Sequence, residues 1–142
     1  MDIQVNLLSV ITATVVAYII GALWYSVLFR KQWMIVTGFN KRSAAEQKAA
    51  AQEAGPLYII QLIITFIEAY VLAHFMQLAL QAQGSPYEII WWALIGVVFP
   101  TLIGAVMWSG VSREVLWKQI GIQAACQVVT LAAMAGVIGL WM

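Results

Sequence analysis

Apolar residues along the chain fall into four long runs that are separated by shorter polar stretches. The runs cover approximately residues 5–29, 57–80, 89–110 and 120–142. A helix needs about 20 mainly apolar residues to cross a bilayer, and each run reaches that length. The pattern therefore predicts an all-α fold, a four-transmembrane-helix bundle, as a single integral membrane domain over residues 1–142.

A further, shorter helix is predicted between the first two runs. Ser43 and Glu46 have the spacing of a capping box, in which each side chain accepts a hydrogen bond from a free N–H group at the start of a helix. Alanines follow, and Gly55-Pro56 is a typical helix stop. We therefore expect a short cytoplasmic helix at about residues 44–54, lying in the first loop.

The polar stretches differ in charge, and this predicts the topology. The loops after the first and third runs hold all seven cations: Arg30, Lys31, Lys41, Arg42, Lys48, Arg113 and Lys118. Because Lys and Arg accumulate on the cytoplasmic side, both termini are predicted to lie outside in a multi-pass protein of the cell's inner (plasma) membrane. No cation precedes the first run, which is also too long for the apolar core of a signal peptide, so we expect it to be retained.

Composition supports the same class of protein. Hydrophobic residues make up 63% of the chain and charged residues 9%, against about 45–50% and 25% in soluble domains. The net charge of +1 argues against nucleic acid as a partner, because binding phosphates needs a clear excess of clustered cations. The expected partner is the lipid bilayer.

Aromatic and cationic residues mark the cytoplasmic ends of the odd-numbered helices. Such side chains favour the headgroup layer, where the ring is half in water and the cation reaches phosphate. We interpret six of them as interface anchors: Trp24, Tyr25, Arg30, Lys31, Trp108 and Arg113.

Small residues recur at four-residue spacing on the first and third helices. Such ridges let helix backbones approach closely in lipid, where no hydrophobic effect drives helices together. The ridges are Ser9, Ala13, Ala17 and Gly21 on the first helix, and Gly96, Pro100 and Gly104 on the third. We expect the first and third helices to lie together through them.

The two ridges belong to a wider similarity between the halves of the chain. Residues 19–30 align with residues 102–113, sharing Ile, Gly, Ala, Ser and Arg in register. The second and fourth helices also carry similar polar faces, and the difference in offset is about the length of the extra cytoplasmic helix. One hypothesis is therefore two parallel-repeated helical hairpins, related by an axis along the membrane normal; chance matching between apolar helices is the alternative.

These stretches also carry a resemblance to a known family. IIGALWYSVLFRKQWM, the later LIGVVFPTLIGAVMWSG and the closing GVIGLWM resemble the bacterial membrane-protein family of domain of unknown function 1761. The most specific part is Gly21, Trp24, Tyr25 and Ser26; after the serine this chain has Val27, where the family often has proline. The resemblance implies a four-helix membrane protein and brings no activity or catalytic residues with it.

Candidate chemistry centres on Glu68, near the middle of the second helix. An ionised acid there costs roughly 2.5–3.5 kcal/mol on insertion scales, so something must offset it. Helical spacing puts Glu68 on one face with Gln61 and Thr65, and the fourth helix offers Gln127 and Thr130. Either Glu68 is a structural group, protonated or hydrogen-bonded to the fourth helix, or these five residues form an ion or proton site.

Metal, cofactor and catalytic chemistry are not predicted. With one His and one Cys, the chain cannot assemble a cluster of soft metal ligands, and His74 is expected to be structural. Ser26 and Ser109 are predicted near the membrane side opposite His74, so no nucleophile lies beside a base. We therefore expect no enzyme, no metal and no cofactor.

Two classes of function remain open. One is an oligomeric transporter, linked to protons or cations and centred on Glu68, since four helices enclose little space by themselves. The other is an accessory or scaffold subunit of a larger membrane protein complex. Ridges used up within one chain would favour a self-sufficient bundle, whereas outward-facing ridges would favour a partner.

Overall fold

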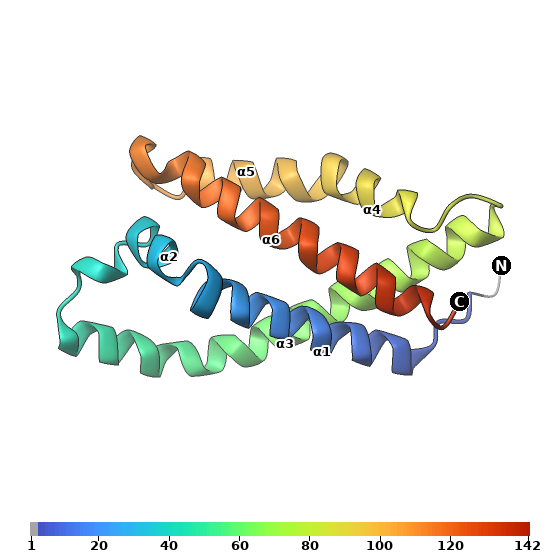
Figure 1. Ribbon diagram of the computed structural model, residues 1–142, viewed down its shortest axis with the longest axis horizontal. Coiled ribbons are helices and arrows are strands. Elements are labelled where there is room, and N and C mark those ends of the chain that lie inside the picture. The colour runs from blue at the N-terminus through green and yellow to red at the C-terminus, as the bar shows by residue number, and fades with distance from the viewer. Residues whose placement is uncertain (1–2) are drawn as a thin grey trace.

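The computed structural model describes residues 3–142, which form helices joined by short turns (Figure 1). Among these residues there is no β-strand, and four segments are long and apolar enough to cross a membrane: Leu7–Leu28, Ala44–Gln81, Glu88–Met107 and Arg113–Gly139. The prediction of an all-α fold with four helices long and apolar enough to span a membrane is confirmed. The first two residues, which bear on the expectation of a retained first helix, lie outside the described part.

The first segment starts as a regular helix and ends irregularly. Helix α1 (Leu7–Leu23) begins at Asn6, whose side chain accepts a hydrogen bond from the Leu8 N–H at 2.9 Å. A π-helical turn, η1 (Trp24–Leu28), follows, closed by the Phe29 N–H donating to the Trp24 carbonyl five residues back. The chain then forms the short α2 (Arg30–Val36) and a 3-10 turn, η2 (Phe39–Lys41).

The second segment is one long helix, α3 (Ala44–Gln81). Its capping box is present as predicted: the Glu46 N–H donates to Ser43 Oγ, and the Ser43 N–H donates to the Glu46 carboxylate at 2.7 Å. The predicted stop at Gly55-Pro56 is wrong, however, because the helix continues through Pro56. The separate helix at 44–54 is therefore an extension of the membrane helix.

Two features allow the helix to pass this proline. Proline clashes with the Cβ of the residue before it, and Gly55 has none. Proline also leaves the carbonyl four residues earlier without its N–H partner; that residue, Gln52, is exposed and its carbonyl lies where water or headgroups can bind it. At 1.5 Å per residue, α3 is about 57 Å long, well beyond the roughly 30 Å of a hydrocarbon core.

The second half of the chain forms the remaining two segments. The third consists of α4 (Glu88–Ala93), a π-helical turn η3 (Leu94–Val98) and α5 (Phe99–Met107). The fourth is a single helix, α6 (Arg113–Gly139), which begins earlier than the predicted residue 120. Its polar first turns are helical as well, because an apolar run marks only the part of a helix that lipid covers.

The core forms where α1 packs between α3 and α6. The ridge on α1 lies in this contact, since Ser9, Ala13 and Ala17 are all at most 2% exposed. The prediction that the first and third helices lie together is wrong: the third segment packs mainly on α6 instead. Small side chains permit a close approach but do not choose the partner.

The ridge on the third segment faces outward. Gly96 and Pro100 are exposed, and a Cβ added to Gly96 or Gly104 would meet no atom within 4 Å. Larger side chains make the inward contacts of this segment, because Leu94 and Val106 are buried. The small-residue ridge on α1 is therefore packed within the chain, whereas the ridge on the third segment lies at the surface.

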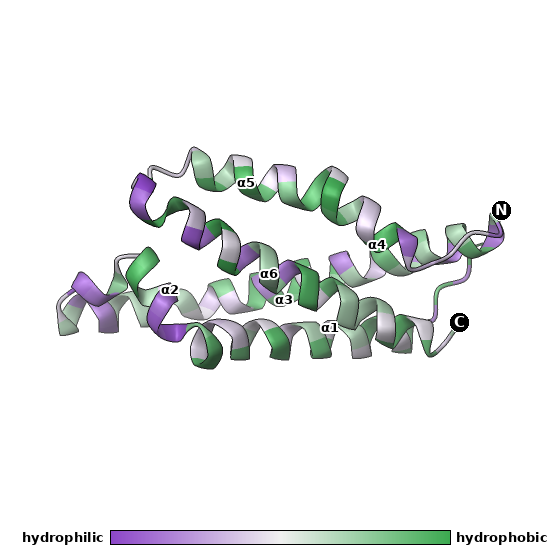
Figure 2. Cartoon of the chain, turned by 45° about the horizontal axis from the view of Figure 1, so that its top comes forward, coloured by the Kyte–Doolittle hydropathy of each residue, from purple (hydrophilic) through white to green (hydrophobic). Residues whose placement is uncertain are grey.

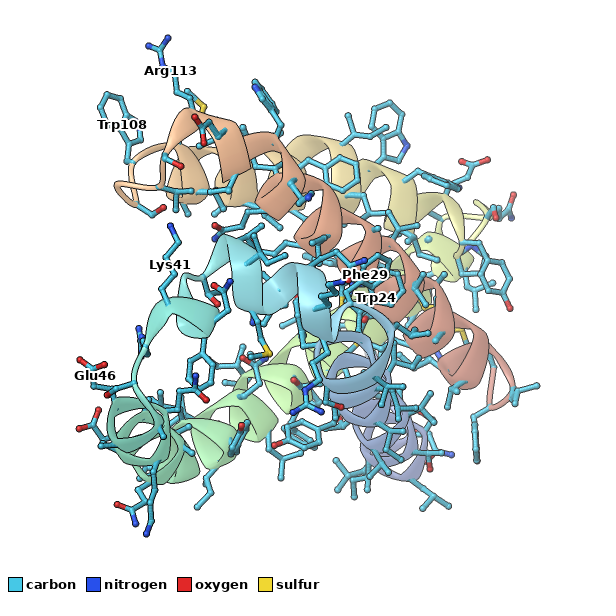
Figure 3. The ribbon with its side chains drawn as sticks, turned by 60° about the vertical axis from the view of Figure 1, so that its left-hand side comes forward. Trp24, Phe29, Lys41, Glu46, Trp108 and Arg113 are labelled. Atoms are coloured by element: carbon cyan, nitrogen blue, oxygen red, sulfur yellow. The ribbon has the colours of Figure 1, made fainter. Side chains whose placement is uncertain are left out.

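The two ends of the bundle differ in charge. Both termini lie at one end, and α2 lies at the other, together with the turn between α5 and α6 (Figure 1). Lys41 and Arg113, from different loops, are both seen at this second end in Figure 3. Hydrophilic residues gather there, whereas apolar colour dominates along the helices, interrupted by hydrophilic turns on α6 (Figure 2).

The packing of α1 leads to a stability test. Ala13→Leu should destabilise the protein by about 1–3 kcal/mol, because the larger side chain has no room between α1 and its neighbours. Gly104→Leu is the matched control and should leave stability unchanged, since its Cβ meets open space. Thermal unfolding in mild detergent measures both; equal losses in the two variants would contradict this packing.

Candidate functional site

A cavity of about 730 Å³ lies between α1, α3 and α6, beside η1 and α2. It is lined by residues of five elements: Ala17, Tyr18, Gly21, Ala22, Tyr25, Ser26, Trp33, Tyr58, Gln61, Thr65, Glu68, Cys126, Gln127 and Thr130. All five residues of the predicted ion or proton site are among them.

The cavity begins where the close packing of α1 ends. Ala17 is the last buried residue of α1, and Thr65 is the first buried residue of α3. Beyond them, towards the α2 end, Gly21 contributes no side chain and residues 57–64 of α3 are exposed. Thus α1 and α3 pack closely up to Ala17 and Thr65, and a space opens between them towards the α2 end of the bundle.

The α3 wall is polar, and one of its groups has no partner. Thr65 Oγ1 donates to the Gln61 carbonyl at 2.8 Å, and Gln61 Nε2 lies 3.4 Å from Thr65 Oγ1, to which it donates. Glu68 follows on the same face and is partly buried. Within residues 3–142 the structure gives its carboxyl no hydrogen bond and no ion pair.

The α6 wall carries a second unpaired group. Cys126 Sγ lies 3.8 Å from Thr130 Oγ1, so these two side chains contact each other. Gln127 Oε1 is buried and accepts no hydrogen bond. The structural alternative for Glu68 is a carboxyl that is protonated or hydrogen-bonded to the fourth helix, and in the described residues it has no hydrogen bond to Gln127 or Thr130.

Aromatic rings form the remaining walls. Tyr18 OH donates to the Tyr58 carbonyl at 3.1 Å, which joins α1 to α3. The rings of Tyr25 and Trp33 are tilted against each other with centroids 4.6 Å apart, and Tyr25 lies beside the thiol of Cys126. The rings therefore extend from the polar residues around Glu68 to the rim, which is the open end of the cavity, where Tyr58 is 62% exposed.

Two of the aromatic residues predicted as headgroup anchors make contacts within the bundle. Tyr25 lines the cavity, and Trp24 Nε1 donates to the Ile122 carbonyl of α6 at 3.1 Å. Trp24 and Phe29 lie side by side against this helix, with ring centroids 4.8 Å apart (Figure 3). Trp108, by contrast, is 89% exposed as an anchor should be.

Helical spacing explains the inward direction of Tyr25, because Tyr25 continues the four-residue spacing of Ala17 and Gly21 on one face of α1. The π turn holds one residue more than an α turn, so the side chains after it are rotated around the helix relative to a regular helix. The chain then turns through Phe29, whose φ of −115° is not helical, and α2 brings Trp33 back over Tyr25. Neither event can be read from hydrophobic periodicity.

Two other polar side chains of the apolar segments lie apart from the cavity lining. Gln123 shares the polar face of α6 but is not among the lining residues. His74 Nδ1 donates to the Tyr70 carbonyl at 2.9 Å, and the two rings are in contact, as expected of a structural histidine. In the described part of the chain, no group of three or more potential metal ligands comes together.

The sequence matches the model of a known protein family. Residues 8–139 match the family model described as a protein of unknown function, DUF1761. The chain belongs to the DUF1761 family. This confirms the resemblance that the Gly21 to Ser26 segment suggested, and comparisons with curated proteins and with solved structures gave no match.

The electrostatics of the DUF1761 cavity point to positively charged ligands. Glu68 is the one acid among the lining residues described, and no Lys, Arg or His lines the cavity with it. A carboxylate at membrane depth without a partner is costly unless it binds a proton or a cation. The site can therefore exchange one positive charge for another.

The unpaired Gln127 oxygen leads to a second stability test. A buried acceptor without a donor costs about 1–3 kcal/mol, so Gln127→Met should leave the protein as stable as the wild type, or make it more stable. Thermal unfolding in detergent measures the change. A loss as large as that expected for Ala13→Leu would mean that Gln127 supports the fold and would contradict the unpaired state of its oxygen.

Proposed function

We propose that this DUF1761 protein is an oligomeric membrane transporter without catalytic activity, which moves a proton or cation by binding it at Glu68. The observation that supports this most is the unpaired carboxyl of Glu68 in a cavity at the middle of a membrane helix. Intramembrane acids are rare because they are costly, and they mark ion pathways and proton relays when retained.

The shape of the bundle fits one of the two states that transport requires. The cavity extends from Glu68 towards the α2 end of the bundle, with exposed Tyr58 at its rim. On the other side of Glu68 the helices are closed by fully buried side chains, including Met76 of α3 and Met134 of α6. Access from the second side would require these core contacts to separate.

Two exposed surfaces support an oligomer. Residues 57–64 of α3 are exposed on all sides, the polar Gln61 included. The Gly96 to Gly104 ridge faces outward and would let another helix approach closely. A second copy that covers α3 would also complete the wall of the cavity.

The same outward ridge favours a second candidate function. An accessory or scaffold subunit needs a surface that is adapted to another membrane helix, and this ridge provides one. In that case the partner would be a different membrane protein, and Glu68 would be a structural group. The two candidates differ in whether Glu68 matters for transport.

The proposed topology places the cavity mouth on the cytoplasmic side of the inner membrane, with both termini outside. Its support is the charge asymmetry, because the positively charged loops all lie at the α2 end. The internal repeat stays a hypothesis: η1 and η3 fall at different points of the two halves.

The transport proposal predicts the behaviour of purified protein in vesicles. With a pH gradient applied, wild-type protein should accelerate dissipation of the gradient or uptake of a cation, and Glu68→Gln should abolish this because it cannot titrate. Glu53→Gln is the matched control, since Glu53 is an exposed acid of the same helix outside the cavity. A pH-sensitive dye inside the vesicles records the rate.

Several outcomes decide between the candidates. Loss of transport in Glu68→Gln alone, at unchanged oligomeric mass, would support the transporter. Equal transport in wild type and Glu68→Gln would contradict the role of Glu68. Wild-type protein that moves neither protons nor any cation of a broad panel, including drug-like amines, would leave the accessory subunit as the better proposal.

The topology predicts which residues an impermeant reagent can reach. In a Cys126→Ala background, Ala49→Cys should resist an impermeant thiol reagent in intact cells and react after the membrane is opened. Ala49 suits this test because it is exposed on the α3 extension, whereas nearby Gln47 holds the loop by donating to the Arg42 carbonyl. Rapid labelling of intact cells would contradict the topology.

A further inference from the structure

We propose that the cavity binds a protonated primary or secondary amine that carries an aromatic or other apolar body. This deepens the proposed function, and rests on it, by naming the class of cation that Glu68 binds. The assignment uses three features of the cavity, namely its charge, its hydrogen-bond acceptors and its aromatic walls.

The charge of the cavity selects for a cation. Glu68 is not balanced by any basic side chain among the lining residues described. The other titratable groups that line the cavity are the hydroxyls of Tyr18, Tyr25 and Tyr58 and the thiol of Cys126, none of which is a basic group. A ligand with one positive charge would therefore neutralise the site.

The acceptors select for a cation that has N–H groups. Glu68 and Gln127 line the same cavity from α3 and α6. Within the described residues, neither the Glu68 carboxyl nor the buried Gln127 Oε1 accepts a hydrogen bond. The Gln61 amide donates to Thr65 Oγ1, and the structure gives it no hydrogen bond to either of these acceptors. An ammonium group could donate to Glu68, and to Gln127 Oε1 once the Gln127 amide turns towards the cavity, whereas a quaternary ammonium has no N–H group to offer.

The size and walls of the cavity select for an organic cation over a metal ion. A hard metal cation takes about six to eight oxygen ligands gathered around one point, carboxylates above all, and Glu68 is the one carboxylate among the lining residues described. Volumes of about 300–1,000 Å³ are typical of sites for small organic molecules, and this cavity measures about 730 Å³. Rings such as Tyr25 and Trp33 bind cations through their faces and pack against apolar groups.

These features together orient the ligand. The ammonium group would lie at the deep end, between Glu68 and Gln127, and the apolar body would extend past Tyr25 and Trp33 towards Tyr58 at the rim. Gly21 lies along this path, and a Cβ there would meet no atom within 4 Å. A larger side chain at residue 21 would therefore occupy ligand space without straining the fold.

Equilibrium dialysis of the full-length protein in mild detergent tests the assignment, with empty micelles subtracted. The probes are naphthylethylamine, the neutral naphthylethanol and the trimethylated quaternary amine, which share one apolar body. At pH 7 the primary amine should bind at least tenfold more tightly than the other two. Equal binding of amine and alcohol would overturn the charge argument, and equal binding of the primary and quaternary amines would overturn the N–H argument.

Three variants locate the binding. Glu68→Gln should remove the preference for the amine over the alcohol, and Gln127→Leu should reduce the preference for the primary over the quaternary amine. Gly21→Leu should weaken the binding of all three probes. Its control Gly104→Leu, which lies outside the cavity, should leave the binding of all three unchanged. Amine binding that survives both Glu68→Gln and Gly21→Leu would place it elsewhere and overturn the proposal.

Binding and transport can fail separately. Tight, Glu68-dependent amine binding by a protein that transports nothing in vesicles would contradict the proposed function and support this inference. Glu68-dependent proton or metal-cation transport by a protein that binds no amine would support the function and overturn the inference.

Discussion

The close contact of α1 with both α3 and α6 is the constraint on which the rest of the structure depends. In lipid, helices gain nothing from hiding apolar surface from water, so backbones must come near enough for dispersion contacts to hold them. Ser9, Ala13 and Ala17 allow this on α1 because their side chains are small. Without that contact, α3 and α6 would have few direct contacts with each other.

The cavity is a consequence of where this contact stops. Past Ala17, α1 carries large aromatic side chains and a π turn, and the neighbouring part of α3 is exposed. The polar groups left there, Glu68 and the Gln127 oxygen above all, are unpaired in the described structure. Leaving such groups unpaired lowers stability, which is typical of a site that is kept ready for a ligand.

Much of the fold follows from the sequence because lipid imposes strict rules. Every backbone N–H and C=O group in the hydrocarbon must be paired, so each long apolar run becomes a helix. The start of α3 is also predictable, since the Ser43 and Glu46 side chains can complete hydrogen bonds over four residues without any tertiary contact. Likewise, helical periodicity alone puts Gln61, Thr65 and Glu68 on one face.

The features that could not be predicted from the sequence depend on contacts between distant residues. A run of small residues looks the same whether it meets the third helix or α6, so the partner of α1 was predicted wrongly. Gly55-Pro56 is a helix stop in water, but a preceding glycine and an exposed carbonyl let α3 continue. The aromatic part of the site could not be predicted because Trp33 reaches Tyr25 only through the π turn at Trp24–Leu28 and the turn at Phe29.

We propose Glu68 as a reactive carboxyl inside a cavity that opens towards the α2 end of the bundle. A hydrophobic carbodiimide probes this group selectively, because it enters lipid and reacts with protonated carboxyl groups that water-soluble reagents do not reach. We expect one adduct per chain, located at Glu68 by peptide mass spectrometry, and slower labelling in the presence of naphthylethylamine. A Glu68 that stays unlabelled, or labels at the same rate with and without the amine, would contradict this role.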